Sequence, residues 1–413
     1  MTINAESGAM RILLTGGRSP AALELARLFQ AAGHRVFAAE SAPYHLCRVS
    51  RFVERSFAVP DPANNPSDFA KSLRSIIETC GIDILVPTCE EIFHIARESS
   101  WFEGVCQIFA PTIDELERLH HKGKFIRLSE HLGFKVPETL QIESPEEWVP
   151  LLEDARFKEG IVLKPAYSRF ASRTQLLDTS SSLLSVHQRQ EMIRKLRESQ
   201  ASPRYPWVAQ QLLRGEEWCT YSVAHGGELA AHVAYRSRFR AGRGATIHYA
   251  PSFQPLLLDW VRRFVEQIGF TGQIAFDFMI LPDGTIAPLE CNPRATSGVH
   301  LFGTNGGLAE AILSPSRLLG AESLAMPASG NGQGAMLSAA MLSYGLLQAA
   351  GERAFGQWLR AFWNSRDVVY RRDDPKPFLE QFRLLAWTSR IARRNGLTMQ
   401  EASTLDIEWN GDR

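Results

Sequence analysis

Residues 272–300 carry side chains that could bind a metal ion. Two apolar runs rich in β-branched and aromatic residues flank Pro282-Asp283-Gly284, and Asp-Gly between such runs predicts a β-hairpin. If Asp283-Gly284 is a two-residue loop closed by Pro282 and Thr285, the pairing places Asp277 directly opposite Glu290. Because like charges directly opposed destabilise a hairpin, the pattern predicts a positive charge between these carboxylates.

Asn292 shares the strand face of Glu290, since side chains alternate along a strand. Two carboxylates and an amide oxygen are hard ligands that suit Mg²⁺, with Mn²⁺ as an alternative ion, and Mg²⁺ keeps water and phosphate in its other positions. Arg294 follows on the loop, where a guanidinium could meet a transferring phosphoryl group. The alternative interpretation is a solvated acidic face beside a tight turn.

This stretch, with Asp277-Phe278, then Leu289-Glu290-Cys291-Asn292 and Pro293-Arg294, resembles the metal-binding hairpin of the ATP-grasp superfamily. That superfamily includes D-alanine–D-alanine ligase, biotin carboxylase and the carbamoyl phosphate synthetase domains. The resemblance implies ATP and Mg²⁺ as cofactors, with Asp277, Glu290 and Asn292 as metal ligands and with Asn292 and Arg294 at the reacting phosphate.

Two lysines are expected to hold the nucleotide phosphates. Lys164 ends the apolar run Ile161–Leu163 and precedes a proline, and a compact point charge there suits phosphate oxygens. Lys122 resembles the other nucleotide-site lysine of the family, and Lys124 is its rival for that role. Most family members then carry a glycine-rich phosphate loop, whereas residues 166–173 contain no glycine and offer Ser168 and Arg169 instead.

The stretch 206–217 resembles the family's linker between its two ATP-clasping subdomains. There an edge-strand backbone pairs with adenine and a late glutamate takes the ribose hydroxyls. The positions that match this pattern are Gln210, Gln211, Leu212, Leu213 and Glu217. Gln210 stands where a glutamate is more usual, and it still offers an acceptor to the adenine amino group.

Residues 10–110 alternate strands, at 12–14, 36–39, 82–86 and 107–110, with helices, one of them at 68–80. Such repeats predict a parallel sheet covered by helices. Gly16-Gly17 and Glu40 invite a dinucleotide-binding alternative, but the loop lacks the full G-x-G-x-x-G spacing. Glu90 lies past a strand end, where α/β sheets bind ligands, and could meet a substrate ammonium; a solvated helix N-terminus is the alternative.

Further acceptor-site residues are expected near the metal hairpin. Arg243 and His248 follow an arginine-rich strand, and Arg243 is the candidate for neutralising a carboxylate or acyl phosphate. Ser297 and Gly298 belong to a small-residue loop suited to close approach of substrate. No chemistry is predicted for the mainly helical residues 331–413, which are expected either to cover the active site or to form an oligomer surface.

The predicted fold class is α/β and α+β. Its parts are an N-terminal Rossmann-like pre-ATP-grasp domain at 10–110, a two-subdomain ATP-grasp fold at 111–206 and 207–330, and a helical C-terminal extension at 331–413. The 413 residues include 45 basic and 45 acidic side chains, so net charge does not indicate nucleic acid or an anionic membrane as a partner. The six cysteines are scattered without CxxC spacing, and we expect a cytoplasmic protein, with a homodimer as one option.

The motifs together predict an ATP-dependent ligase. Such an enzyme activates a substrate carboxylate as an acyl phosphate, releases ADP, and couples the acyl group to an amine, here an amino-acid-like metabolite in biosynthesis. No side-chain nucleophile is required. The alternatives are a carboxylate kinase or carbamoyl-phosphate-type enzyme, a non-catalytic nucleotide-binding protein, and a nicotinamide-dependent oxidoreductase.

Overall fold

The structure is a computed structural model that describes residues 8–151, 154–167, 173–177, 190, 194, 201–242, 244–319, 324–327 and 333–411. The chain forms two compact units. The first comprises Met1–Leu116, Cys219–Ala275 and Asn292–Trp409, and the second comprises Glu117–Trp218, Phe276–Cys291 and Asn410–Arg413. The predicted four-part division of the chain stays a prediction.

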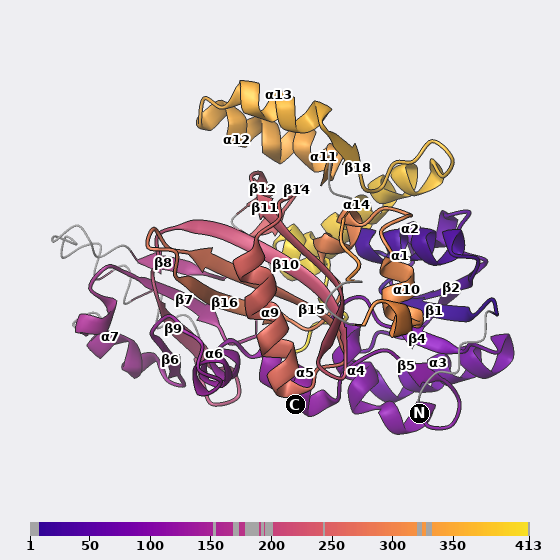
Figure 1. Ribbon diagram of the computed structural model, residues 1–413, viewed down its shortest axis with the longest axis horizontal. Helices are drawn as coiled ribbons and strands as arrows, with labels where there is room; N and C mark the ends of the chain where they lie inside the picture. Colours follow the sequence, from indigo (N-terminus) through magenta and orange to yellow (C-terminus); the bar gives the residue numbers. More distant parts are fainter. Residues whose placement is uncertain are drawn as a thin grey trace. The chain divides into compact units, whose positions relative to one another are not determined.

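A five-stranded parallel sheet, in the order β3-β2-β1-β4-β5, organises the N-terminal part of the first unit (Figure 1). Its strands are β1 (Arg11–Thr15), β2 (Arg35–Glu40), β3 (Arg55–Ala58), β4 (Ile84–Val86) and β5 (Gln107–Ile108). Ile12 and Leu14 pack in one core with helix α1 (Pro20–Ala31), whereas Leu13 packs in another with α3 (Pro66–Cys80). Helices therefore cover both faces, and the predicted parallel sheet is confirmed.

The C-terminal extension belongs to the same unit as this sheet. Its helices are α11 (Ser338–Ala340), α12 (Leu346–Gly351), α13 (Phe355–Trp363), α14 (Lys376–Asn395) and α15 (Met399–Ala402). Buried ion pairs join it to the N-terminal part: Arg27 on α1 contacts Asp374 at 3.0 Å, and both side chains are almost fully buried. No helix in the described part of the chain combines the length and the apolar character needed to cross a bilayer.

A seven-stranded sheet has the order β16-β15-β10-β11-β14-β17-β18. Strands β10 and β11 of this sheet form an antiparallel pair around Gly226-Gly227. The strands in chain order are β10 (Glu216–His225), β11 (Glu228–Ser237), β14 (His248–Pro251), β15 (Gly272–Ile280), β16 (Ile286–Asn292), β17 (Gly334–Met336) and β18 (Ser365–Asp367). The C-terminal extension, predicted as mainly helical, thus also contributes the last two strands.

The second unit contains a four-stranded antiparallel sheet in the order β6-β9-β7-β8. Its strands are β6 (Thr139–Ile142), β7 (Ile161–Pro165), β8 (Gln175–Leu177) and β9 (Trp207–Gln211). Trp148 and Trp207 pack edge to face in its core, with ring centroids 5.9 Å apart. The remaining elements used below are α2 (Leu46–Val49), α4 (Glu91–Arg97), α5 (Ile113–His120), α6 (Lys122–His131), α7 (Trp148–Leu151), α9 (Pro255–Ile268), α10 (Leu308–Leu313), β12 (Arg240–Ala241) and β13 (Ala245–Thr246).

A buried histidine on β11 should make the stability of the first unit depend on pH. His232 is 1% exposed and its Nδ1 shares a hydrogen bond with Ser222 Oγ at 2.9 Å. Burial lowers the pKa of His232 from 6.5 to about 3, and Arg262 acts in the same direction. Between these values the unfolded chain binds a proton that the folded chain does not, so stability falls as the pH falls, by up to about 1.4 kcal/mol per pH unit.

We expect His232→Gln to lose about 2 kcal/mol less than the wild type when the pH is lowered from about 7 to about 5. Urea unfolding at both pH values measures this difference. His131→Gln, at an exposed position on α6, is the control and should keep the wild-type dependence. Identical pH slopes for His232→Gln and the wild type would contradict the prediction.

Candidate functional site

Helix α6 brings a lysine to the metal hairpin. The side chain of His121 caps the helix by accepting from the Lys124 N–H at 3.1 Å, and the Lys122 N–H donates to the Ala166 carbonyl at 3.1 Å. The side chain of Lys122 is 3% exposed, with its Nζ 3.6 Å from Glu290 Oε2, whereas Lys124 is exposed. Of the two lysines that the sequence left open, only Lys122 reaches a predicted metal ligand.

Lys164 is a second buried cation beside the same hairpin. It lies near the end of β7 and is 7% exposed. Its Nζ donates to Gln210 Oε1 at 3.0 Å and to the Leu289 carbonyl at 3.2 Å. Burial lowers the pKa of Lys164 to about 8, although the negative charges of Glu290 and Asp277 oppose that shift. The structure therefore brings together Lys164 and Gln210, two residues that separate sequence motifs had assigned to the nucleotide.

The residues predicted to bind adenine lie at the end of β9 and directly after it. The amide group of Gln210 is oriented at both ends, since its Nε2 also donates to Thr139 Oγ1 at 3.2 Å. Gln211 N donates to the Glu138 carbonyl at 2.8 Å and Leu212 N to the Gly160 carbonyl at 3.0 Å. The candidates for pairing with adenine are consequently the Leu212 carbonyl and the Leu213 N–H. Glu217 is the second residue of β10, and its side chain is exposed to solvent.

Glu290 stays ionised in this setting. Burial alone would raise the pKa of Glu290, but Lys122 and Lys164 hold it at about 2, and an interaction with the Asp277 side chain acts in the same direction. The side chain of Glu290 is 30% exposed. The two predicted carboxylate ligands thus interact with each other, and the positive charges expected beside them are the two lysine ammonium groups.

The turn of the metal hairpin differs from the sequence prediction. Leu281 N donates to the Thr285 carbonyl at 2.9 Å and Gly284 N donates to the Leu281 carbonyl at 2.9 Å. The loop therefore has three residues, Pro282–Gly284, rather than the predicted two, and Gly284 adopts φ +82°. A three-residue loop with glycine in the left-handed region is a common hairpin geometry. The pairing of residues derived from a two-residue loop was therefore wrong next to the turn.

Asn292 is the last residue of β16 and Arg294 follows it, and both belong to the first unit. Arg294 Nη2 donates to Asn292 Oδ1 at 3.1 Å, and its Nη1 donates to the Ala295 carbonyl at 3.2 Å. Arg294 N also donates to the Asn292 carbonyl at 2.8 Å. The predicted catalytic arginine is therefore tied to the predicted amide ligand.

The donor set fits a hard divalent cation. Glu290 is an ionised carboxylate beside a second carboxyl group, that of Asp277. Asn292, the third predicted ligand, is the last residue of β16 and belongs to the first unit, so its part in the metal site stays a prediction. Carboxylate oxygens suit Mg²⁺, whose remaining positions take water and phosphate. The nearby ammonium groups of Lys122 and Lys164 are suited to the phosphate groups that such an ion accompanies.

The predicted acceptor residues have mostly structural partners. Glu90 is 1% exposed, and its Oε2 accepts from the Trp409 N–H at 3.2 Å. His248 is 6% exposed, its Nε2 shares a hydrogen bond with Ser365 Oγ at 3.1 Å, and burial lowers its pKa to about 4. Both side chains face other parts of the first unit, because burial and not loop position decides their environment.

Ser297 and Gly298 begin a short 3₁₀ turn at Ser297–Leu301. Ser297 hydrogen-bonds Tyr249, which lowers the pKa of that phenol, although burial raises it overall to about 12. A Cβ on the buried Gly298 would lie 2.3 Å from Tyr221 Cβ. Gly298 is thus required for packing against Tyr221, which gives this glycine a reason other than the predicted close approach of substrate.

Three predicted site residues lie outside the described residues: Ser168, Arg169 and Arg243. Their roles at the phosphates and the acceptor stay predictions. The same holds for the way in which the glycine-free phosphate loop closes.

Glu40 and Gly16, which suggested dinucleotide binding, both have structural roles in the first unit. Glu40 is 3% exposed, and its carboxylate accepts from the Arg18 side chain and from the backbone N–H groups of Arg18, Ser41 and Ala42. Burial would raise the pKa of Glu40, but Arg18 holds it at about 2. A Cβ at Gly16 would lie 2.5 Å from Thr88 Oγ1. Glu40 therefore serves as the partner of Arg18, and the glycine serves packing.

Sequence reasoning missed Thr139 and Arg18. Thr139 enters the site because β6 pairs with β9 and sets it opposite Gln210, and no local motif in the sequence signals that pairing. Arg18 lies inside the glycine turn that the sequence analysis examined only for dinucleotide spacing. Its pairing with a carboxylate 388 residues away is a tertiary contact that no spacing rule reveals.

Comparisons with known proteins give the fold. No family model matches the chain. It is 22% identical over 302 residues to the arginine-specific large chain of carbamoyl phosphate synthase from Geobacillus stearothermophilus, covering 70% of this chain and 27% of that one. It is 22% identical over 223 residues to the C-terminal section of the carbamoyl phosphate synthase large chain from Methanopyrus kandleri, covering 51% and 39%. The chain thus spans well under half the length of these curated relatives.

Solved structures match over more of the chain. The L-amino acid ligase from Bacillus licheniformis has a TM-score of 0.54 at 13% identity, covering 74% of this chain and 75% of that one. The biotin carboxylase domain of 2-oxoglutarate carboxylase from Hydrogenobacter thermophilus, solved with ADP, magnesium and bicarbonate, has a TM-score of 0.58 at 13% identity, covering 77% and 72%. At this identity the similarity shows the fold, and the chain therefore has the ATP-grasp fold that its motifs predicted.

Proposed function

We propose that this protein is an ATP-dependent, ADP-forming ligase that couples a carboxylic acid to an amine. One observation carries the proposal. Within one compact unit, Lys122 contacts Glu290 and Lys164 donates to Gln210, and the charges of Lys164 and Glu290 act on each other. Two buried ammonium groups lie beside two half-buried carboxylates, and the cost of desolvating such charges favours a binding function. Binding a nucleoside triphosphate with its metal ion is such a function.

The roles of the residues follow from their charges. Lys122 and Lys164 would hold phosphate oxygens as point charges. Asp277, Glu290 and Asn292 would hold Mg²⁺, which neutralises phosphate charge when it is bound. Gln210 and the backbone at Leu212 and Leu213 would receive adenine, and Glu217 the ribose. Arg294, whose guanidinium is bonded to Asn292, would then be held near the reacting phosphate.

The reaction needs positioning and charge neutralisation but no side-chain nucleophile. A carboxylate oxygen of the substrate forms a bond to the γ-phosphorus while the bond to ADP breaks, giving an acyl phosphate. The amine nitrogen then attacks the acyl carbon, phosphate leaves, and the nitrogen loses a proton. Lys122, Lys164 and Arg294 would stabilise the charge that develops on the transferring group.

The comparisons support this chemistry but not a substrate. The similar proteins include an L-amino acid ligase, a biotin carboxylase domain and carbamoyl phosphate synthases, and these act on different substrates. The acid and the amine are proposed to be small, amino-acid-like molecules. The cytoplasmic location and the homodimer stay predictions, as does the absence of nucleic acid and membrane partners.

ADP release with Mg-ATP tests the proposal. We would supply a panel of amino acids and small carboxylic acids, with and without added amines. ADP that forms only when one acid and one amine are both present would establish a ligase and identify its substrates. ADP with the acid alone would indicate a carboxylate kinase or carbamoyl-phosphate-type enzyme. Stabilisation by ATP without any turnover would favour the non-catalytic nucleotide-binding alternative.

A matched pair of lysine variants checks that the ADP comes from this site. Lys122→Ala removes the buried ammonium beside Glu290, whereas Lys124→Ala removes an exposed ammonium two residues later. We expect the first to abolish ADP release and the second to leave it unchanged. Equal activities would assign ADP release to another site or to a contaminant.

A further inference from the structure

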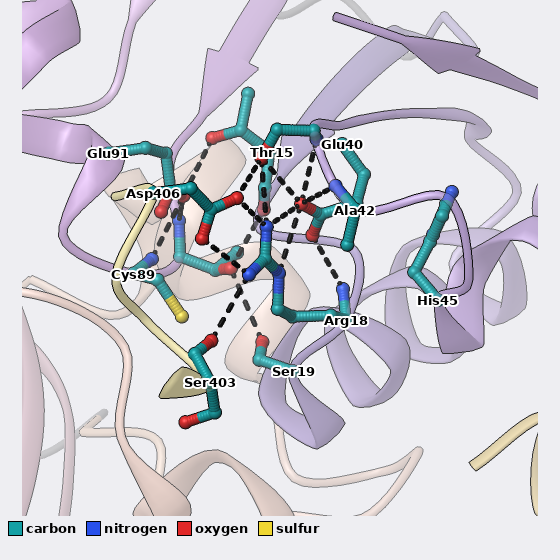
Figure 2. Close-up of polar contacts among 12 residues, drawn as sticks. Thr15, Arg18, Ser19, Glu40, Ala42, His45, Cys89, Glu91, Ser403 and Asp406 are labelled. Carbon is teal, nitrogen blue, oxygen red and sulfur yellow. Dashed lines mark hydrogen bonds and ion pairs between the residues drawn. The ribbon is translucent and has the colours of Figure 1, made fainter. Parts of the chain in front are cut away.

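Arg18 lies at the carboxyl edge of the N-terminal sheet with its guanidinium held between two carboxylates (Figure 2). Glu40 takes the Nε edge, with Arg18 Nε donating to Glu40 Oε1 at 3.0 Å. The outer edge donates to Asp406, from Nη1 to Oδ1 at 2.8 Å and from Nη2 to Oδ2 at 2.6 Å. Ser41 Oγ adds a third donor to Asp406 Oδ2 at 2.6 Å.

This arrangement has the form of a carboxylate receptor. Two parallel N–H donors from one guanidinium match the two oxygens of a carboxylate, and a hydroxyl fixes one of them further. Glu40 orients the guanidinium from behind and is itself held by the backbone N–H groups of Ser41 and Ala42. The carboxylate that fills the receptor comes from the C-terminal segment of the same chain.

Arg18 lies at the edge of the five-stranded sheet at which α/β proteins bind their ligands. The strand order β3-β2-β1-β4-β5 reverses between β1 and β4, and ligands of such sheets lie outside the carboxyl ends of the strands at that reversal. Residues 403–409, here named the C-terminal cover, contact the loops after three strands. Asp406 contacts Arg18 after β1 and Ser41 after β2, and the Trp409 N–H donates to Glu90 after β4.

The rest of the cover packs on the same edge. The Trp409 ring stacks on Phe93 of α4 with centroids 5.6 Å apart, and the Arg97 guanidinium lies 5.1 Å from the Trp409 ring centre. The Ser403 carbonyl accepts from Arg18 Nη1 at 3.1 Å. The cover therefore occupies the space in which a ligand of this sheet would lie.

We infer that Arg18 and Ser41 form a binding site for the carboxylate of a small acid, and that Asp406 occupies this site as an intramolecular competitor. The inference deepens the proposed function by placing a carboxylate-bearing substrate at this sheet, and it rests on that function only for the identity of the acid. The local effective concentration of a tethered competitor is high, so the cover weakens the binding of free acids until it is displaced.

A second arginine–aspartate pair in the same unit provides the contrast. Arg27 and Asp374 are 0% and 2% exposed, and Arg27 also donates to the carbonyls of Val368 and Val369. Asp406, in comparison, is 18% exposed. The Asp406 side of the Arg18 pair is therefore partly exposed to solvent, whereas the Arg27 pair is enclosed by the protein.

The test measures whether a free carboxylate can take the place of Asp406. Thermal unfolding of the full-length Asp406→Ala variant is followed in acetate, succinate and L-glutamate, with acetamide and chloride at matched concentrations. We expect saturable stabilisation by at least one of the acids and none by acetamide, with an affinity at least about tenfold above that of the wild type. Asp406→Asn provides the same measurement if the alanine variant does not fold.

Two controls make the result specific. Asp374→Ala should not be stabilised by the acids, because its arginine is enclosed. Asp406→Ala combined with Arg18→Gln should lose the stabilisation seen in the single variant. Equal effects of acid and acetamide, the same effect in Asp374→Ala, or an effect that survives Arg18→Gln would overturn the inference.

A second experiment, on the wild-type protein, tests whether a free acid displaces the C-terminal cover. Hydrogen exchange of backbone amides in residues 403–409 should accelerate in the acid that stabilises Asp406→Ala, because that acid displaces the cover. Unchanged exchange would make Asp406 a permanent structural ligand and would overturn the role of competitor. Stabilisation by Mg-ATP, measured in the same variants, separates this outcome from a failure of the proposed function, since the nucleotide residues are other side chains.

Discussion

Glu290→Gln is expected to reduce ADP formation by at least about 10³-fold while the protein remains folded. The substitution keeps the size of the side chain and removes its charge. Glu290 is the carboxylate on which Lys122 and Lys164 both act, and we propose it as a metal ligand. A neutral amide would bind a divalent cation weakly and would leave the charge of the two lysines uncompensated.

The measurement is single-turnover ADP release with Mg-ATP and the substrates found in the panel, together with circular dichroism and urea unfolding. Because the Glu290 side chain is 30% exposed, its replacement should leave unfolding cooperative. Asp283→Asn is the matched control, since it removes an exposed charge from the turn of the same hairpin and asparagine is tolerated in turns. Near-normal ADP formation by Glu290→Gln would refute the assignment of this hairpin as the metal site.

The sequence could predict this hairpin because its signals are local. Alternating apolar residues, an Asp-Gly turn and acidic residues at fixed offsets all lie within 272–300. The length of the turn was wrong by one residue, because a two-residue and a three-residue loop both accept Asp-Gly. Glu290 and Asp277 nevertheless interact. The sequence therefore identified two interacting carboxylates although the strand register used to pair them was wrong.

The acceptor-site residues were harder to assign, because loop position says nothing about burial. Glu90 and His248 carry polar groups that suggest ligand contacts, yet each is buried against a segment far away in sequence, Trp409 for the first and Ser365 for the second. Gly298 was interpreted as room for substrate, which stays a prediction, and tight packing against Tyr221 also requires a glycine there. In each case the competing demand was tertiary packing.

The C-terminal extension shows the same limit on a larger scale. Its helices could be predicted from their periodicity, but no pattern indicated that it would dock on the N-terminal part through ion pairs. Arg366 pairs with Glu24, Arg48 with Glu380, and Arg27 with Asp374, across 332–347 residues of chain. The carboxylates of these pairs are buried, and a partner of opposite charge compensates for each desolvated group.

Asp374→Ala is therefore expected to cost about 3–5 kcal/mol of stability, the range found when one partner of a buried ion pair is removed. Asp374 Oδ2 accepts from Arg27 Nη2 at 3.0 Å and from Ser50 Oγ at 2.8 Å, and its Oδ1 accepts from the Arg51 N–H at 3.0 Å. The variant would leave the fully buried Arg27 without its counter-charge. Urea unfolding of the full chain measures the loss.

Asp373→Ala is the matched control, because the neighbouring Asp373 pairs with Arg371 where both side chains are substantially exposed. Exposed pairs contribute about 0–1 kcal/mol, so this variant should stay close to the wild type. Replacing both partners, as Arg27→Met with Asp374→Leu, should recover much of the loss, since apolar side chains can fill a site from which both charges are removed. If Asp374→Ala were as stable as Asp373→Ala, the extension would be held by its apolar contacts, and the Arg27–Asp374 pair would contribute only to the specificity of docking.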